Sequence, residues 1–454
     1  MFKRVTISLG LLLLSGCAAY GVIDNDPLSE SVPSSAYSIE NKAHGQGSGD
    51  ITMTLAFSGG GTRAAALAYG VLEELRDTTV LIDGQSRRLL DEVDIISSVS
   101  GGSFTSAYYG LHGDRIFEDF KDKFLYQDIE SQLVRGLLNP LVWLGPTGRT
   151  EMAVKIYEEE VFHGATFADM QRTDGPLILI NASDLGYGVR FSFVQEYFDL
   201  LCSDINSFPV SRAVTASSAV PLVFHPIVVE NYYDCKTAGK PDWLVAAAER
   251  MDNDPDMAQV IRGLESYYEK DHREYAHFVD GGITDNLGLR AIYEVVELAG
   301  GAGELFKMHS IKPPRYAALI TVNASTDPET AIDKTNKQPS VAETISAMSN
   351  VQLHRYNDVT QALTERSLER WAASLSTPDH TVTPYNVQVG FKHILHPDDR
   401  SFFNRIPTSF SLTEEQVDRL IEAGGALLRN NPNYQRLLAD LGGRAGSSSN
   451  TPTL

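Results

Sequence analysis

The sequence lacks any apolar run that approaches the roughly 20 residues of a membrane-spanning helix, so it does not cross a bilayer as a channel. It is also poor in basic residues, because 38 Lys and Arg stand against 59 Asp and Glu, giving a net charge of −21 with His neutral. An acidic chain is repelled by phosphate groups. A nucleic-acid partner and docking on anionic lipid through a basic patch are therefore both disfavoured.

Motifs for metal binding are missing as well. The 11 His residues are scattered without an H-E-x-x-H spacing, and no calcium-loop pattern occurs. We therefore expect no metal site and no cofactor. The composition is otherwise that of a globular protein, with 43% hydrophobic residues over 454 positions and no short repeat. This excludes a collagen, a coiled-coil rod and a largely disordered chain.

Residues 1–16 are predicted to be a secretory signal, because Lys3 and Arg4 precede a short apolar stretch. The tetrapeptide Leu-Ser-Gly-Cys that ends at Cys17 resembles the lipobox of bacterial lipoproteins, in which the Cys becomes the lipidated first residue of the mature chain. The alternative is a plain signal peptide with an incidental Cys. Ala18, where an Asp would retain the protein, matches outer-membrane sorting. We expect an exported chain anchored by lipid to the bacterial envelope, most simply the outer membrane.

Cysteine is scarce, with three residues in the whole chain. Besides Cys17, only Cys202 and Cys235 remain, and an even pair in an oxidising compartment is a disulfide candidate. Closing a loop of about 33 residues would contribute roughly 3–4 kcal/mol in the chain-entropy model. The alternative is a pair of free, buried thiols.

Short apolar runs separated by helical stretches predict an α/β protein with a largely parallel sheet, since strands buried on both faces lack an alternating pattern. We expect a flexible tether over residues 17–50, an α/β core over 51–325, a helical C-terminal part packed on the core over 326–441, and a disordered tail over 442–454. The predicted strands are Ile51 to Phe57, Val93 to Ser98, Pro176 to Asn181, His277 to Val279 and Tyr316 to Asn323.

Three motifs follow predicted strands, where ligand sites of open α/β sheets lie. The first is the glycine run Gly59, Gly60 and Gly61 before a predicted helix. Its backbone N–H groups and the helix dipole suit a phosphate or the oxyanion of a tetrahedral intermediate. Together with Ala64 and the later Asp83, the run also satisfies a dinucleotide fingerprint, which leaves a nucleotide-binding protein as a remote alternative.

The second motif places Ser100 at the turn between a strand and a helix, between Ser98 and the pair Gly101 and Gly102. Strand, sharp turn, Ser and helix form a nucleophile elbow, in which small neighbours avoid clashes. Ser98 stands where Gly is usual. The alternative is a Ser/Gly-rich loop without a chemical role.

The third motif is Asp280 followed by Gly281 and Gly282 after an apolar strand. It places a carboxylate on a tight turn, although an Asp-Gly turn without chemistry is the competing interpretation.

Together the three motifs resemble the patatin-like phospholipase family, over roughly residues 51–325. The resemblance implies a three-layer α/β/α sandwich and a Ser–Asp dyad in place of a triad. It makes Ser100 the nucleophile and Asp280 its base, and Gly59 to Gly61 the oxyanion loop, with Arg63 matching the loop arginine. The implied activity is hydrolysis of lipid acyl esters of the phospholipase A or lysophospholipase type. A lipoprotein that binds lipid or protein on an inactive fold is the main alternative.

A hidden triad needs a histidine, and the sequence offers His277 and His225. His277 is three residues before Asp280 on a strand and should point to the opposite face. His225 follows an apolar run and is expected to be a core or rim residue. The stretch Leu133 to Leu144 is apolar and is either core or a lipid-facing lip. Glu158 to Glu160 is expected to be a solvated helix face.

Overall fold

The computed structural model describes residues 20–28, 35–42, 47–129, 131, 148–221, 223–233, 239–251, 255–327, 332 and 335–443. Among these residues, no helix is both long and apolar enough to cross a membrane. Cys17, Cys235 and the stretch 133–144 lie outside the described residues. Cys202 is disulfide-bonded.

Within the described residues, an eight-stranded sheet forms the centre of the molecule, in the order β12-β11-β2-β5-β6-β10-β9 with β7 paired to β6. Strands β12 to β6 along this path are parallel, while β7, β9 and β10 are antiparallel to their neighbours. The prediction of a mostly parallel sheet is confirmed. The strands are β2 (Ile51–Phe57), β5 (Val93–Val99), β6 (Leu177–Asp184), β7 (Arg190–Ser192), β9 (Ile227–Glu230), β10 (Tyr275–Val279), β11 (Tyr316–Asn323) and β12 (Thr383–Gly390).

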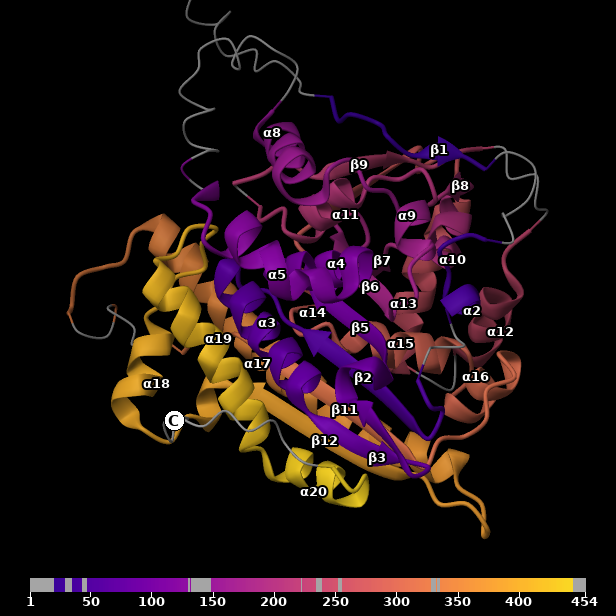
Figure 1. Cartoon of the computed structure of the whole chain (residues 1–454). Coiled ribbons are helices and arrows are strands. Elements are labelled where there is room, and N and C mark those ends of the chain that lie inside the picture. Colours follow the sequence, from indigo (N-terminus) through magenta and orange to yellow (C-terminus); the bar gives the residue numbers. More distant parts are fainter. Residues whose placement is uncertain are drawn as a thin grey trace, which may run out of the picture.

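Helices cover both faces of this sheet and complete three layers (Figure 1). One layer holds α3 (Thr62–Asp77), α4 (Gly101–His112), α19 (Glu414–Arg429) and α20 (Pro432–Asp440). The other holds α15 (Leu289–Leu298) and α17 (Val341–Leu375), which pack on each other and on the sheet. The α/β/α sandwich is therefore confirmed.

Helices α3 and α19 approach each other closely through glycine. A Cβ on Gly70 would lie 2.0 Å from the carbonyl oxygen of Ile421, and one on Gly424 would lie 2.3 Å from the carbonyl oxygen of Leu67. Real Cβ atoms do not reach such distances, so both positions require glycine. This contact joins the first core helix to the C-terminal part of the chain.

The C-terminal part is mainly helical, but it also supplies strand β12 to the sheet, which the sequence reading missed. All eight residues of β12 pair in parallel with β11. The strand carries Pro384, Asn386 and Gln388, and its partly exposed residues alternate with buried ones through its middle. It was missed because an edge strand need not be apolar on both faces. The C-terminal part therefore completes the core rather than packing on its outside.

The prediction of a flexible tether over residues 17–50 is wrong for two segments, 20–28 and 35–42, which are fixed on the core. The side chain of Asn25 donates to the carbonyl oxygen of Glu230 and accepts its N–H, both at 2.9 Å, along the free edge of β9. Tyr37 is fully buried, and its hydroxyl bonds both backbone groups of Ile178. Composition alone does not reveal such docking, because it rests on a few side chains.

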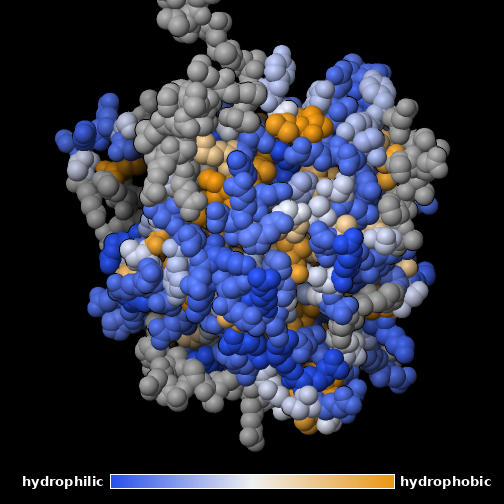
Figure 2. Space-filling model, turned by 45° about the horizontal axis from the view of Figure 1, so that its top comes forward, coloured by the Kyte–Doolittle hydropathy of each residue, from blue (hydrophilic) through white to orange (hydrophobic). Residues whose placement is uncertain are grey.

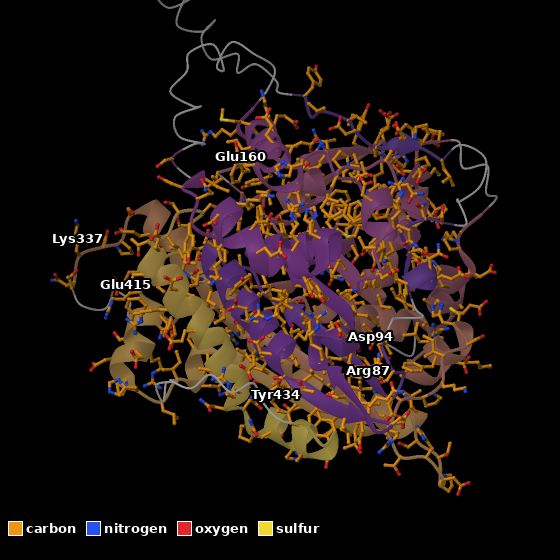
Figure 3. The ribbon with its side chains drawn as sticks, viewed as in Figure 1. Arg87, Asp94, Glu160, Lys337, Glu415 and Tyr434 are labelled. Atoms are coloured by element: carbon orange, nitrogen blue, oxygen red, sulfur yellow. The ribbon has the colours of Figure 1, made fainter. Side chains whose placement is uncertain are left out.

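Two acidic residues labelled in Figure 3, Glu160 and Asp94, differ in their exposure to solvent. Glu160 is exposed, and so is Glu159, which agrees with the predicted solvated face; Glu158 is half-buried and accepts a hydrogen bond from the hydroxyl of Ser211. Asp94 lies at a bulge between β2 and β5 and accepts the N–H of Met53 at 2.8 Å. Burial raises the pKa of Asp94 to about 7.

Candidate active site

Ser100 stands at the carboxyl end of β5, directly before α4, in a backbone conformation that non-glycine residues rarely adopt. Its φ of 51° and ψ of −120° lie outside the regions that non-glycine residues favour. Such strain at a Ser between strand and helix is the geometry of a nucleophile elbow. The expected elbow is therefore present in the backbone.

The two glycines after Ser100 are required by close packing. A Cβ on Gly101 would lie 2.0 Å from the carbonyl oxygen of Gly61, and one on Gly102 would lie 2.8 Å from the carbonyl oxygen of Ser58. On the other side of the turn, the buried Ser98 accepts a hydrogen bond from the hydroxyl of Ser106 at 2.6 Å. The glycines bring the elbow against the glycine loop, and Ser98 is small enough to replace the usual Gly.

A residue with no role in the sequence analysis fixes the backbone of Ser100. Ser217 ends α11 (Val210–Ser217), and its hydroxyl accepts the N–H of Ser100 at 2.8 Å. The same hydroxyl donates to the carbonyl oxygen of Asn181 at 2.6 Å. The one sequence signal that points to it is the run of small residues in the stretch Ala213 to Pro221.

Asp280 follows β10, and its carboxyl lies close enough to the Ser100 side chain for that side chain to lower its pKa. The N–H of Gly282 donates to its Oδ1 at 2.7 Å, and the N–H of Asp280 donates to the carbonyl oxygen of Ala219 at 3.0 Å. Gly281 is required, because a Cβ there would lie 2.4 Å from the carbonyl oxygen of Asn181. The structure thus brings together the two residues expected to form a dyad, although they are 180 positions apart in sequence.

Burial changes the acidity of this carboxyl. Desolvation raises the pKa of Asp280 from 3.8 to about 6, and the hydrogen bonds from Gly282 and Ser100 lower it in part. A carboxylate with a higher pKa is a better proton acceptor and is still ionised at neutral pH. Asp280 is therefore suited to take a proton from the Ser100 hydroxyl.

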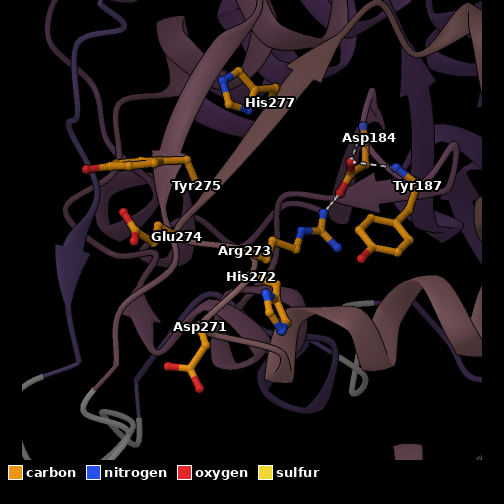
Figure 4. Close-up of a pocket in the computed structure, with 9 residues that line it drawn as sticks. Asp184, Tyr187, Asp271, His272, Arg273, Glu274, Tyr275 and His277 are labelled. Carbon is orange, nitrogen blue, oxygen red and sulfur yellow. Dashed lines mark hydrogen bonds and ion pairs between the residues drawn. The ribbon is translucent and has the colours of Figure 1, made fainter.

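Neither candidate histidine is hydrogen-bonded to this pair in the described part of the chain. His277 lies on β10 opposite Val228, where it lines a hollow of about 390 Å³ with Arg273 and Asp184 (Figure 4). His225 is exposed, and its backbone groups bond the hydroxyl of Thr150. The expectation that both lie apart from the chemistry agrees with this geometry.

The three N–H groups of the glycine loop differ in whether they already have a hydrogen-bond acceptor. The N–H of Gly59 donates to the carbonyl oxygen of Asn286 at 2.9 Å. The N–H groups of Gly60 and Gly61, whose φ values are 140° and 63°, have no acceptor among the described residues. The expectation that all three glycines serve an oxyanion therefore needs correction, because the Gly59 donor is already engaged. Asn286 is a supporting residue that the sequence analysis did not find.

Arg63 does not point a free donor at the site. Its buried guanidinium donates to the carbonyl oxygens of Ala324 at 2.9 Å and Ile406 at 2.5 Å, and to the hydroxyl of Thr408 at 3.0 Å. The expectation that Arg63 belongs to the oxyanion hole is thus corrected, since it joins the loop to the C-terminal part. The loop has a second connection there, because the N–H of Thr62 donates to the carbonyl oxygen of Ser409 at 2.9 Å.

The hollow in Figure 4 is a separate feature with its own charges. Arg273 is buried beside Asp184 and also donates to the hydroxyl of Ser266, while its guanidinium lies 3.7 Å from the ring centre of Tyr267. Asp184 in turn accepts the N–H groups of Gly186 and Tyr187 (Figure 4). Since these groups satisfy one another, the cluster holds β6 and β10 together. Among the described residues, no group of three or more His, Cys, Asp or Glu could hold a metal ion.

The dinucleotide alternative fails on the position of Asp83. This residue lies in the turn of a hairpin between β3 (Thr79–Ile82) and β4 (Gln85–Arg88), which form a separate two-stranded sheet. A ribose-binding carboxylate belongs at the end of a neighbouring parallel strand. The glycine loop lies instead beside Ser100, which favours an oxyanion over a pyrophosphate.

One protein family and several solved structures are similar to this chain. The family model described as patatin-like phospholipase matches residues 55–293. The comparison with curated proteins found no match. Among solved structures, human GIVD cytosolic phospholipase A2 is similar, with 14% identity, a TM-score of 0.42, and coverage of 87% of this chain and 62% of that chain. The same human enzyme in complex with methyl gamma-linolenyl fluorophosphonate has 12% identity, a TM-score of 0.38, and coverage of 87% and 59%. The chain thus spans about three fifths of these proteins.

Proposed function

Because the chain belongs to the patatin-like phospholipase family, we propose that it is a serine acyl hydrolase that cleaves carboxylic ester bonds of lipids. The proposed type is phospholipase A or lysophospholipase, with a Ser–Asp dyad. The observation that carries the proposal is the strained elbow that places Ser100 beside the buried carboxyl of Asp280, whose pKa burial raises to about 6.

In the proposed mechanism, the Ser100 Oγ attacks the ester carbonyl carbon while Asp280 accepts the hydroxyl proton. The carbonyl oxygen becomes negative and is held by the N–H groups of Gly60 and Gly61. Collapse of the tetrahedral intermediate breaks the ester bond, and the proton on Asp280 passes to the leaving alcohol. Water, deprotonated by Asp280, then attacks the acyl-enzyme and releases the carboxylic acid and free Ser100.

A carboxylate can serve as the sole base here because the fixed contact between Asp280 and Ser100 compensates for the low pKa of a carboxylate. A free Asp, with a pKa near 3.9, is a weak acceptor for a serine proton. Burial raises the pKa of Asp280 and so reduces the pKa difference between it and the Ser100 hydroxyl. Holding the two groups in contact also removes the entropic cost of bringing them together. The proposal therefore requires no histidine.

We further propose that Cys17 carries the lipid that anchors the mature protein to the bacterial envelope. The sequence up to Cys17 supports this, as set out above. A single acyl chain gives only marginal binding, whereas the several chains of a bacterial lipoprotein anchor firmly. Radiolabelled palmitate should label the wild type and not a Cys17→Ala variant; equal labelling contradicts the anchor.

The activity is tested by hydrolysis of p-nitrophenyl esters from acetate to palmitate, using protein that lacks residues 1–17 beside its Ser100→Ala variant. We expect turnover that is lost with Ser100, and the chain-length optimum reports on the acyl pocket. Folded protein with no activity above the variant at any length would contradict the hydrolase and favour a lipid-binding role.

A further inference from the structure

The N-terminal segment is fixed to the core within a few residues of Cys17. A Cβ on Gly21 would lie 2.3 Å from Cγ2 of Val228, so the chain passes directly over strand β9 at this point. Asp24 then pairs with the buried Arg212 at 2.5 Å, and Asn25 bonds the backbone of Glu230. The chain is therefore held on the core at Gly21, Asp24 and Asn25, which leaves only a short connection to Cys17.

The length of chain between the anchor and this contact is short. Gly21 lies four positions after Cys17, and these four residue steps span at most about 14 Å when fully extended. A flexible tether ending near residue 50 would instead have an average reach of about 30 Å. A lipid on Cys17 therefore keeps β9 close to the membrane surface.

The point of attachment lies near the catalytic carboxylate. Val228, on which Gly21 packs, pairs with His277 of β10, and Asp280 follows three residues later, about 10 Å along the strand. In Figure 1, β9 and the start of the described chain share the top of the molecule, opposite β3 at the bottom. Anchoring through Cys17 thus brings the catalytic end of the sheet to the lipid.

Exposed apolar side chains surround this end of the sheet, and we call Tyr20, Val220, Val223 and Ile283 the apolar rim. Their exposed fractions are 88%, 39%, 51% and 53%. Ile283 and Val220 flank the catalytic carboxylate, because Ile283 N–H donates to the carbonyl oxygen of Asp280 and Val220 follows Ala219, the acceptor of Asp280 N–H. Figure 2, in which the top of the molecule comes forward, shows hydrophobic patches on this face.

We propose that the apolar rim rests on the bilayer that holds the Cys17 lipid, so that Ser100 faces the membrane and receives lipid directly from it. This inference rests on the proposed lipid anchor and hydrolase activity. Electrostatic attraction does not account for such docking, because the chain carries a net charge of −21. The short chain between Cys17 and Gly21 accounts for the docking, since it keeps the apolar rim at a high effective concentration near the bilayer.

The orientation is tested with the full lipidated chain in vesicles of phosphatidylethanolamine and phosphatidylglycerol that contain nitroxide-labelled lipid. A fluorophore is attached to Val223→Cys or, as the matched control, to Leu81→Cys, both in a Ser100→Ala background. Leu81 has a similar exposed fraction, 53%, but lies after α3, about 24 Å of helix away from the glycine loop. We expect quenching at position 223 to exceed that at position 81 at least threefold. Equal quenching, or more at position 81, would overturn the proposal.

A second measurement lengthens the connection. Twenty Gly and Ser residues inserted between Ala19 and Tyr20 should lower quenching at position 223 toward the control and reduce hydrolysis of vesicle phospholipid several-fold, with p-nitrophenyl butyrate turnover unchanged. An unchanged ratio of the two activities would overturn the fixed orientation. The other proposals fail in different ways: without the hydrolase, both substrates stay intact in every variant, and without the anchor, palmitate labelling of Cys17 is absent.

Discussion

The hydroxyl of Ser217 accepts the backbone N–H of Ser100 at 2.8 Å. The main chain of Ser100 is strained, so this hydrogen bond is one of the contacts that keep the nucleophile turned toward Asp280. Ser217 touches no reacting atom and is a positioning residue. Its own hydroxyl proton goes to Asn181 O at 2.6 Å, which fixes the direction in which its oxygen accepts.

Replacing Ser217 with Ala should lower kcat about tenfold and leave KM within a factor of two, because the buried N–H of Ser100 loses its acceptor. The matched control is Ser218→Ala, whose hydroxyl donates to Val214 O at 2.8 Å within its own helical turn. Steady-state kinetics on a soluble ester compares the two variants. Equal losses in both, or a change in KM alone, would contradict a positioning role.

The proposed dyad predicts the pH dependence of turnover. Asp280 acts as a base only when ionised, and burial raises its pKa to about 6. The kcat/KM should therefore rise with pH and level off above a midpoint near 6, not near 4. Asp280→Asn and Ser100→Ala should each reduce kcat at least 10³-fold. Retained activity in Asp280→Asn, together with loss in a His277 or His225 variant, would point to a triad.

The glycine contact between α3 and α19 predicts opposite effects for two neighbouring substitutions. Gly424→Ala places a Cβ 2.3 Å from Leu67 O and should cost about 1–3 kcal/mol of stability. Gly425→Ala places its Cβ 3.4 Å from Gly70 O and should be neutral or stabilising by up to about 1 kcal/mol, because Ala favours a helix. Thermal unfolding measures both, and equal shifts would show that the close approach does not limit the packing.

Arg63 predicts a link between the C-terminal part and catalysis. Arg63→Lys cannot satisfy Ala324 O, Ile406 O and Thr408 Oγ1 together, so the glycine loop should loosen. We expect kcat to fall about tenfold or more and limited proteolysis near residues 406–409 to accelerate. Arg76→Lys is the control, because Arg76 forms a partly exposed pair with Asp77. Wild-type kinetics in Arg63→Lys would contradict the connection.

The sequence predicts those parts of the site whose chemistry is local. Ser100 and Asp280 were found because each stands on a glycine turn directly after a strand, and β2 and β11 were predicted with their observed bounds. Ser217 and Asn286 were not found, since one acts through a hydroxyl and the other through a backbone oxygen, in contacts made only when distant segments fold together.

The remaining differences have the same physical origin. Strand β12 was missed because an edge strand tolerates polar residues on one face. Segment 35–42 resembles a linker in composition, yet the buried Tyr37 bonds β6 and the N–H of Ile39 donates to Glu196, which together hold it on the core. The N–H of Gly59 was predicted to be available to an oxyanion because its acceptor, the carbonyl oxygen of Asn286, lies 227 positions away in sequence.

The hydrogen bond between Arg63 and Ile406 joins residues 343 positions apart, and this separation orders the events of biosynthesis. A polypeptide emerges from the ribosome amino end first, so the glycine loop is made long before the segment that secures it. Nascent or truncated chains that end before residue 383 lack both this hydrogen bond and strand β12. Because the glycine loop lacks its C-terminal contacts until then, we expect the proposed activity to appear only after the C-terminal part has been synthesised.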